Sequence, residues 1–181
     1  LSCGPDEEGG TVWFSKPTPG AANADAYVPA AASPSIPAAA ITVRINEYAT
    51  KSSVTLADED GDFVSWVELH NYGDEDVSLS GVSLSDDPAK PAKWTFPAGG
   101  YLVVYCSDKS KTWQEGQPLH AGFTLSGKET SLLLSAADGG KVDECAVFEL
   151  TANLSCGRVP NDTDKWKFFP KPTPGRENAG A

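Results

Sequence analysis

From residue 41 the sequence reads Ile41-Thr42-Val43-Arg44-Ile45, and from residue 64 it reads Val64-Ser65-Trp66-Val67-Glu68-Leu69. Apolar and polar side chains alternate along both stretches, whereas the apolar side chains of an amphipathic helix recur every three or four residues. Alternation is typical of a β-strand that turns one face toward a core. Both stretches therefore predict strands.

Further short apolar runs follow, each bounded by turn residues. They are residues 77–79, 82–84, 94–96, 101–105, 130–135, 141–148 and 166–169. The run at 101–105, Tyr-Leu-Val-Val-Tyr, is apolar throughout, which predicts a strand that is buried on both faces. Ala137-Asp138-Gly139-Gly140 between two runs predicts a hairpin turn. Residues 110–117 could form one short helical turn at most, so the sequence predicts an all-β sandwich or barrel.

A repeat links the two ends of the chain. Leu1-Ser2-Cys3-Gly4 recurs at residues 154–157, Lys16-Pro17-Thr18-Pro19-Gly20 recurs at 171–175, and Asn23 matches Asn178. The alignment needs a two-residue gap, which falls in the turn at residues 6–10. Identities in the same order favour a true repeat over shared Pro/Gly punctuation. Residues 1–23 are therefore predicted to be the C-terminal remnant of a preceding repeat copy; the alternative, a lipoprotein cleavage site at Cys3, does not explain the later matches.

Residues 24–40 are rich in Ala and Pro, which prevents a continuous helix and predicts a semi-extended linker. Residues 41–178 then form the single main domain. The remnant contains the apolar segment Val12-Trp13-Phe14, which needs a partner surface. We expect it to pair in cis or to self-associate with another molecule through an exposed strand edge.

The charge balance limits the partners. Acidic residues number 25 and basic residues 14, which gives a formal charge of −11. Nucleic-acid binding needs Lys and Arg against phosphate, so no nucleic acid and no anionic membrane surface is expected. No apolar run reaches the roughly 20 residues of a membrane-spanning helix, so no membrane insertion is expected either.

The strand motifs follow an order that resembles a known family. Ile45-Asn46-Glu47, Asp60-Gly61-Asp62 and residues 66–71, Trp-Val-Glu-Leu-His-Asn, open the pattern. It continues through residues 77–81, 84–87, 93–97, 99–104, 119–125, 142–143, 157–158 and 172–175. This order resembles the bacterial form of the lamin tail domain over about residues 41–178. The resemblance implies an immunoglobulin-like β-sandwich, in a module that is often repeated in large secreted or surface proteins of bacteria.

The resemblance and the linker together favour a non-catalytic binding or structural module of a larger extracellular, cell-surface or periplasmic protein. Its partner would be a protein or a glycan, bound through loops and strand edges. An alternative is an accessory domain that guides substrate to an extracellular enzyme, in which case Tyr105 or Trp113 would be exposed. The chromatin role of nuclear lamins is not carried over, because the negative charge opposes it.

The sequence contains no recognisable catalytic motif. The only histidines are His70 and His120, and the sequence has no Gly-x-Ser-x-Gly nucleophile elbow. A Ser-His-Asp triad requires a base that a carboxylate orients beside an activated serine. The sequence therefore predicts no enzyme and no cofactor, with calcium as the one exception to consider.

Calcium is considered because of Asp58-Glu59-Asp60-Gly61-Asp62. The carboxylates of Asp58, Asp60 and Asp62 alternate along a short loop, and calcium prefers six to eight oxygen ligands from such loops. The pattern is not an EF-hand, because the glycine falls one position early and Leu69 occupies the position of the bidentate Glu. The alternatives are a calcium-dependent adhesion module and a solvated acidic turn.

Four cysteines are present, at positions 3, 106, 145 and 156, and their spacings match no zinc motif. A Cys145–Cys156 disulfide is predicted, because the chain returns on itself between these positions. Cys106 ends an apolar run and is predicted to be a buried thiol.

Overall fold

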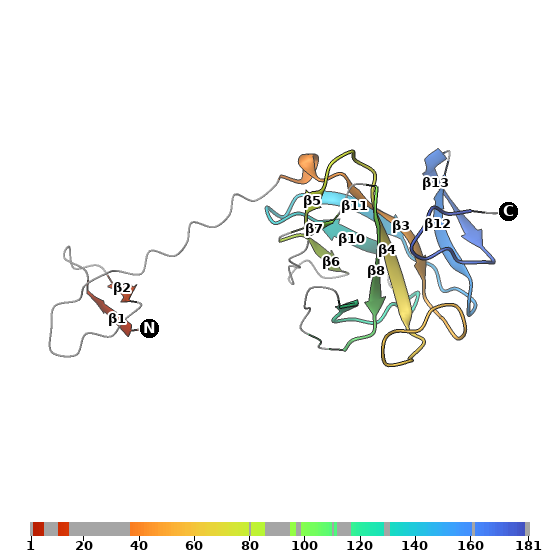
Figure 1. Cartoon of the computed structure of the whole chain (residues 1–181), viewed down its shortest axis with the longest axis horizontal. Helices are drawn as coiled ribbons and strands as arrows, with labels where there is room; N and C mark the ends of the chain where they lie inside the picture. The colour runs from red at the N-terminus through yellow and green to blue at the C-terminus, as the bar shows by residue number, and fades with distance from the viewer. Residues whose placement is uncertain are drawn as a thin grey trace. The chain divides into compact units, whose positions relative to one another are not determined.

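Six strands of the main domain form one sheet. A computed structural model describes residues 2–5, 11–14, 37–79, 81–85, 95–96, 99–109, 111, 117–128, 131–160 and 162–179. The strands are β3 (Val43–Ala49), β4 (Ser65–Asn71), β8 (Tyr101–Cys106), β9 (Leu119–Ala121), β12 (Ser155–Val159) and β13 (Asp162–Phe169). Their order is β13-β12-β3-β4-β8-β9, and every pair is antiparallel except the parallel pair β8–β9 (Figure 1).

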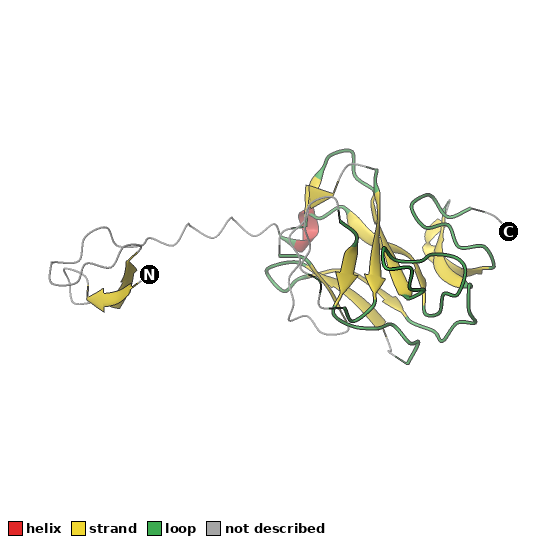
Figure 2. Cartoon of the chain, turned by 60° about the horizontal axis from the view of Figure 1, so that its bottom comes forward, coloured by secondary structure: helices red, strands yellow, loops and turns green. Residues whose placement is uncertain are grey.

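A smaller sheet packs against one face of the large sheet (Figure 2). It consists of β6 (Ser83–Ser85), β10 (Ser131–Ser135) and β11 (Lys141–Ala146), in the order β11-β10-β6. A further pair joins β5 (Val77–Ser78) to β7 (Thr95–Phe96), and one 3-10 turn, η1 (Ala38–Ala40), precedes β3. Among the described residues, no helix has the length and apolar character needed to cross a membrane.

The core lies between the two sheets. Val67 and Leu69 of the large sheet and Leu132 and Leu134 of the small one are members of a single buried apolar cluster. Inward-facing apolar residues on alternate positions of facing strands are what a sandwich requires. The predicted immunoglobulin-like β-sandwich is thus confirmed.

The outer face of the large sheet is also buried along β3 and β4. Because successive side chains of a strand alternate between faces, Trp66 and Glu68 lie on the face opposite Val67, yet both are fully buried. A bulge between Ile45 and Glu47 brings Glu47 directly opposite Glu68. This second buried layer is not the one that the sequence pattern predicts, since polar residues in alternation normally face water.

The prediction for residues 101–105 is wrong about burial. The strand β8 forms as expected, but Tyr101, Leu102 and Val103 are only half-buried. The register places Tyr101 opposite His70 and Val103 opposite Glu68, which puts both on the outer face. The C-terminal residues Thr173 and Gly175 donate hydrogen bonds to Glu47 on β3 and to Glu68 on β4, so the outer face is covered along these two strands.

The predicted hairpin at residues 137–140 is confirmed. β10 and β11 are paired, and the turn between them is closed by a hydrogen bond from the Ala136 amide to the Gly140 carbonyl at 2.8 Å. Gly139 adopts a φ of 81°, which glycine tolerates without strain. Most of residues 110–117, where one helical turn was allowed, lie outside the described residues.

The chain divides into two units, Leu1–Pro34 and Ser35–Ala181. In the first unit, β1 (Ser2–Pro5) and β2 (Thr11–Phe14) form an antiparallel hairpin. In the second, Ala38 packs against the core, so the folded domain begins before Ile41, inside the predicted linker. The assignment of residues 1–23 to a preceding repeat copy stays a prediction.

Candidate functional site

The acidic loop between β3 and β4 is folded by its own first aspartate. The buried Asp58 side chain accepts hydrogen bonds at Oδ1 from the amides of Asp60 (3.0 Å) and Asp62 (2.9 Å). Gly61 adopts a φ of 85° and donates its amide to the Asp58 carbonyl at 3.0 Å. This tight turn directs the carboxylates of Asp58, Asp60 and Asp62 toward one another.

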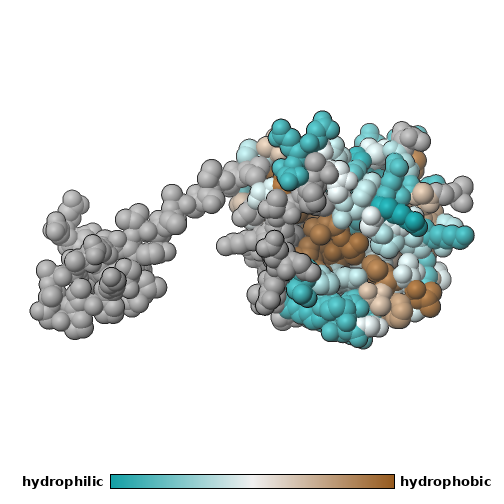
Figure 3. Space-filling view, in the orientation of Figure 1, coloured by the Kyte–Doolittle hydropathy of each residue, from teal (hydrophilic) through white to brown (hydrophobic). Residues whose placement is uncertain are grey.

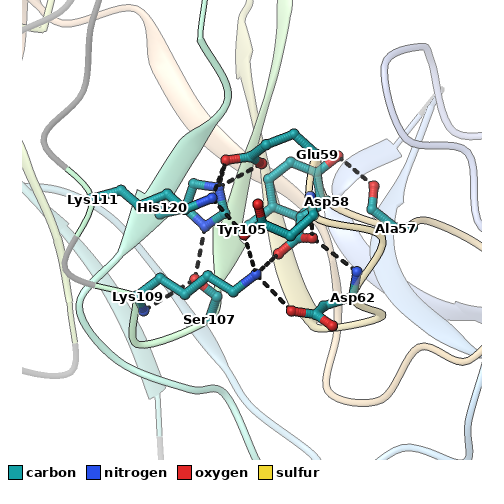
Figure 4. Close-up of polar contacts among 10 residues, drawn as sticks. Ala57, Asp58, Glu59, Asp62, Tyr105, Ser107, Lys109, Lys111 and His120 are labelled. Atoms are coloured by element: carbon teal, nitrogen blue, oxygen red, sulfur yellow. Dashed lines mark hydrogen bonds and ion pairs between the residues drawn. The ribbon is translucent and has the colours of Figure 1, made fainter.

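The ammonium group of Lys109 lies at the centre of these three carboxylates. Its Nζ donates to Asp58 Oδ2 at 2.6 Å, to Asp60 Oδ2 at 2.7 Å and to Asp62 Oδ2 at 2.8 Å. Figure 4 shows the Lys109 side chain reaching the loop from the segment that follows β8 and begins with Ser107. The three residues predicted to bind calcium are therefore brought together, around a cation that the chain itself supplies.

A second lysine and a histidine complete the cluster. Lys111 Nζ donates to Glu59 and, at 2.6 Å, to Asp60 Oδ2. The side chain of His120 is fully buried, with Nε2 at 2.9 Å from Glu59 Oε2 and Nδ1 at 2.7 Å from Ser107 Oγ. The parallel pairing of β8 and β9 sets Tyr105 beside His120, and their rings stack at 5.4 Å.

These contacts hold the loop in its ionised form. Hydrogen bonds from Lys109 and Lys111 lower the pKa of Asp60 to about 2, and a hydrogen bond from Lys111 lowers the pKa of Glu59 to about 2. Burial alone would raise the pKa of Asp58, but hydrogen bonds from Lys109 and from two loop amides outweigh it and lower that pKa. The same carboxylates, Asp58 first, raise the pKa of Lys109, so its charge persists at neutral pH.

The cluster has the donor set of a cation site. One oxygen each from Asp58, Asp60 and Asp62 lies within 4.8 Å of the other two, and a second group is formed by Asp58, Glu59 and His120. Oxygen ligands of this kind fit calcium. Because Lys109 Nζ lies at hydrogen-bond distance from all three aspartates, a metal ion must displace the ammonium to bind there.

Ser107, His120 and Glu59 form a chain of hydrogen bonds that superficially matches a Ser-His-carboxylate triad. The roles do not fit catalysis. The Glu59 carboxylate is also paired with Lys111, and Ser107 Oγ accepts the Lys109 amide at 3.2 Å. The imidazole of His120 is fully buried. The hydrogen bonds through it therefore hold Ser107, where the segment that carries Lys109 and Lys111 begins, against β9.

A second polar cluster is buried under the C-terminal segment. Glu47 and Glu68 face each other across β3 and β4 with no solvent exposure. Glu68 accepts hydrogen bonds from Asn46 Nδ2 at 2.8 Å and from the Gly175 amide. Glu47 accepts from Ser155 Oγ and, at 3.1 Å, from the Thr173 amide. Buried charges of this kind require such donors, since an unpaired buried carboxylate strongly opposes folding.

Asn178 closes this cluster from the end of the domain. Its Nδ2 donates to the carbonyls of Asn46 (3.1 Å) and Arg158 (2.8 Å), and its Oδ1 accepts from Asn46 Nδ2 (3.0 Å) and from Thr173 Oγ1 (3.3 Å). We call Glu47, Glu68 and the donors around them the carboxylate clamp. The clamp fastens the Pro-Thr-Pro-Gly segment and the β12–β13 hairpin, blue in Figure 1, to strands β3 and β4.

The environment raises the pKa of both carboxyl groups. Burial raises the pKa of Glu68 to about 7, against the hydrogen bonds from Asn46 and Gly175, and the facing Glu47 adds to the rise. Burial likewise raises the pKa of Glu47, opposed by hydrogen bonds from Ser155 and Thr173. The sequence offered one signal for this site: the residues of the repeated motif include Ser155, Thr173 and Asn178.

The clamp joins motif residues from both ends of the domain. The model of the lamin tail domain matches residues 36–149. The chain belongs to the lamin tail domain family. The family match ends before β12, so the β12–β13 hairpin and its half of the clamp lie outside the matched residues. No curated protein matches the chain.

Among the cysteines whose side chains the structure describes, Cys106, Cys145 and Cys156 are buried thiols that form no disulfide. The prediction that Cys106 is a buried thiol is confirmed. The predicted disulfide between Cys145 and Cys156 is not present in the structure. Burial raises the pKa of Cys145 to about 12 and also raises that of Cys156, so neither is a thiolate at neutral pH. A buried, protonated thiol is unsuited to nucleophilic chemistry.

The surface of the lamin tail domain exposes a pair of phenylalanines. Phe148, which follows β11, and Phe168 on β13 are 50% and 53% exposed, and their rings meet edge to face at 6.1 Å. Val54, Phe63 and Tyr72 are also exposed, and separate apolar patches lie among polar residues on the face shown in Figure 3. Tyr105, considered for glycan contact, is only partly exposed and donates its hydroxyl to the Ala57 carbonyl at 3.1 Å; Trp113 lies outside the described residues.

Proposed function

We propose that this lamin tail domain is a non-catalytic binding module of a larger secreted or surface-associated protein. The exposed pair Phe148 and Phe168 is the observation that carries the proposal. Exposed aromatic rings in a fixed geometry contribute large contact area at low entropic cost, and such residues dominate the binding energy of many interfaces.

The pair lies at the end of the large sheet. Phe168 belongs to β13, the last strand of the large sheet, whose paired neighbour among the described strands is β12. An edge strand offers backbone donors and acceptors to an incoming extended segment, and neighbouring apolar side chains give that contact affinity and direction. We therefore favour a protein partner over a glycan.

The polar clusters support a structural role for the groups that catalysis would use. His120 is held between Ser107 and Glu59, and His70 stacks on Tyr101 at 4.3 Å. The buried carboxyl groups of Glu47 and Glu68 are occupied with backbone and side-chain donors of the clamp.

The test compares the full chain with a variant that carries Phe148→Ser and Phe168→Ser. Val54→Ser is the matched control, because Val54 is 75% exposed and lies in a different loop. Both variants and the wild type are screened against an array of bacterial extracellular proteins and an array of glycans. The proposal predicts protein binding that the double variant loses and the control keeps. Equal binding by all three chains would contradict it, and binding confined to the glycan array would replace the protein partner with a glycan.

A second candidate is calcium-dependent adhesion, which the convergence of Asp58, Asp60 and Asp62 favours. Calorimetric titration with calcium is the direct test. Binding at millimolar calcium that Asp60→Ala abolishes would support this function, and the absence of binding to the wild type would remove it.

A further inference from the structure

The hairpin of residues 1–14 and the hairpin β12–β13 have the same backbone register. Ser2 pairs with Phe14 as Ser155 pairs with Phe169, and Pro5 pairs with Thr11 as Arg158 pairs with Trp166. The two-residue difference in length falls between these pairs, at residues 6–10 in one copy and at residues 159–165 in the other, where the register shifts after Arg158. Sequence and strand pairing thus independently give the same alignment of residues 1–23 with residues 154–178.

The two copies share the residues that face the domain. Within the described part of residues 154–178, the buried residues are Ser155, Cys156, Gly157, Phe169, Thr173 and Asn178. Each has an identical counterpart in the first copy, respectively Ser2, Cys3, Gly4, Phe14, Thr18 and Asn23. The differences between the copies fall outside these buried positions, as at the exposed Arg176 and Glu177, which both correspond to alanine.

The clamp gives the physical reason for this pattern. Ser155, Thr173 and Asn178 supply hydrogen bonds to the buried Glu47 and to its neighbour Asn46. A Cβ atom at Gly157 would lie 2.7 Å from Asn178 Nδ2 and 3.0 Å from the Asn46 carbonyl, so a side chain does not fit there. A hairpin that docks on nothing has no use for these residues, because they serve contacts outside the hairpin.

We propose that residues 1–23 form a docking element that completes the β-sandwich of a second lamin tail domain, which we call the partner body. The partner is a sandwich whose strands equivalent to β3 and β4 carry a buried pair of glutamates, and whose slot for the C-terminal hairpin is open. Ser2, Gly4, Thr18 and Asn23 complete its carboxylate clamp. This inference is independent of the partner contacts proposed for Phe148 and Phe168.

The differences between the two copies indicate that residues 1–23 dock on a lamin tail domain other than the one in this chain. Arg158 Nη2 contacts Asp143 at 2.9 Å, its Nε donates to the Ile45 carbonyl at 2.7 Å, and its guanidinium lies 4.8 Å from the centre of the Trp166 ring. The first copy has Pro5 and Thr11 at the positions of Arg158 and Trp166. Docking on this chain's own body would leave Asp143 without its guanidinium. The partner body therefore lacks an acidic side chain at the position of Asp143.

The test exchanges one hairpin for the other in the full chain. Residues 154–178 are replaced by the sequence of residues 1–23, with Pro5→Arg in the grafted copy to match Asp143. The graft is expected to unfold in one cooperative transition within about 10 °C of the wild type. Thr18→Ala in the graft lowers that temperature as Thr173→Ala does in the wild type, while Thr18→Ala at the natural N-terminal position leaves it unchanged. A graft that folds but does not respond to Thr18→Ala would overturn the proposal.

A second arm decides the case in which the graft does not fold. The full chain carrying Thr173→Ala, Asn178→Ala and Pro5→Arg has a weakened C-terminal hairpin and an intact first copy, and native mass spectrometry measures its assembly. We expect oligomers in which the first copy fills the slot of a neighbouring chain, and monomers when Thr18→Ala and Asn23→Ala are added. A monomer before that addition, or oligomers that persist after it, would show that the first copy does not dock in this slot.

Discussion

Lys109 shows how one residue can decide the behaviour of a loop. Three aspartates meet at its ammonium group, and one of them, Asp58, has a fully buried side chain. The carboxylates repel one another unless a cation lies between them. The charge pattern at residues 58–62 was readable in the sequence, but Lys109 is distant along the chain and only the strand pairing brings it there.

Replacing Lys109 with Met removes this internal cation and leaves a side chain of similar length. We expect the melting temperature at pH 7 to fall, and millimolar calcium to raise it more in the variant than in the wild type, because an added cation then relieves the repulsion. Differential scanning fluorimetry with and without calcium measures both effects. Lys141→Met is the control, since Lys141 is 62% exposed and pairs only with Glu144 among the described contacts. An unchanged melting temperature for Lys109→Met would contradict the role given to its ammonium group.

In the carboxylate clamp, Asn178 is the single residue on which many contacts depend, as Lys109 is in the acidic loop. Asn178→Ala removes four hydrogen bonds and leaves buried partners unsatisfied. We expect a loss of about 2–3 kcal/mol in the free energy of unfolding, measured by urea denaturation. The neighbouring exposed Glu177 provides the control, for which Glu177→Ala should change the same quantity by less than about 0.5 kcal/mol. Equal effects of the two substitutions would argue against the clamp.

At the scale of elements, alternation along β3 and β4 identified both strands but not their surroundings. Polar residues at alternate positions normally face water, and Glu47 and Glu68 instead face a segment more than 100 residues later in the chain. The bulge between Ile45 and Glu47, which places them opposite each other, leaves no mark in the hydrophobic pattern. The outer buried layer therefore depends on long-range packing that a local pattern cannot show.

The clamp and the acidic loop respond to pH in opposite directions. Glu59 and Asp60 have lowered pKa values near 2, so their contribution to stability is present above their ordinary values, near 4, and is lost as the pH falls toward 2. Glu68 has a raised pKa of about 7 against an ordinary 4.5, so its contribution is complete below 4.5 and is lost as the pH rises through 7. Maximum stability is thus expected near pH 5.

Glu68→Gln tests the basic side of this profile. In the wild type, we expect the free energy of unfolding to decrease by roughly 3 kcal/mol or less between pH 5 and pH 8, because each pKa unit corresponds to about 1.4 kcal/mol. The variant has no titrating group at this position, so most of that decrease should vanish, whatever its absolute stability. Urea denaturation at a series of pH values gives the slope. A slope that is the same in both chains would show that Glu68 does not titrate in this window.

At the scale of the whole molecule, the account rests on a complete sandwich within Ser35–Ala181 and on a separate hairpin within Leu1–Pro34. The main domain has its own core between two sheets and its own hairpin in the clamp, so we expect it to fold without the first unit. The repeated motif can be recognised from the sequence because it is unusual, whereas the burial of Ser155, Thr173 and Asn178 against the domain can be seen only in the structure.

The most direct test of this account is thermal unfolding of residues 35–181 alone beside the full chain, with the mass of each measured in solution. The account predicts one cooperative transition at the same temperature for both chains, and a monomeric shorter chain. A shorter chain that melts well below the full chain, or that does not fold, would mean that residues 1–34 are part of the sandwich in this chain and would contradict the division into a complete domain and an independent docking hairpin.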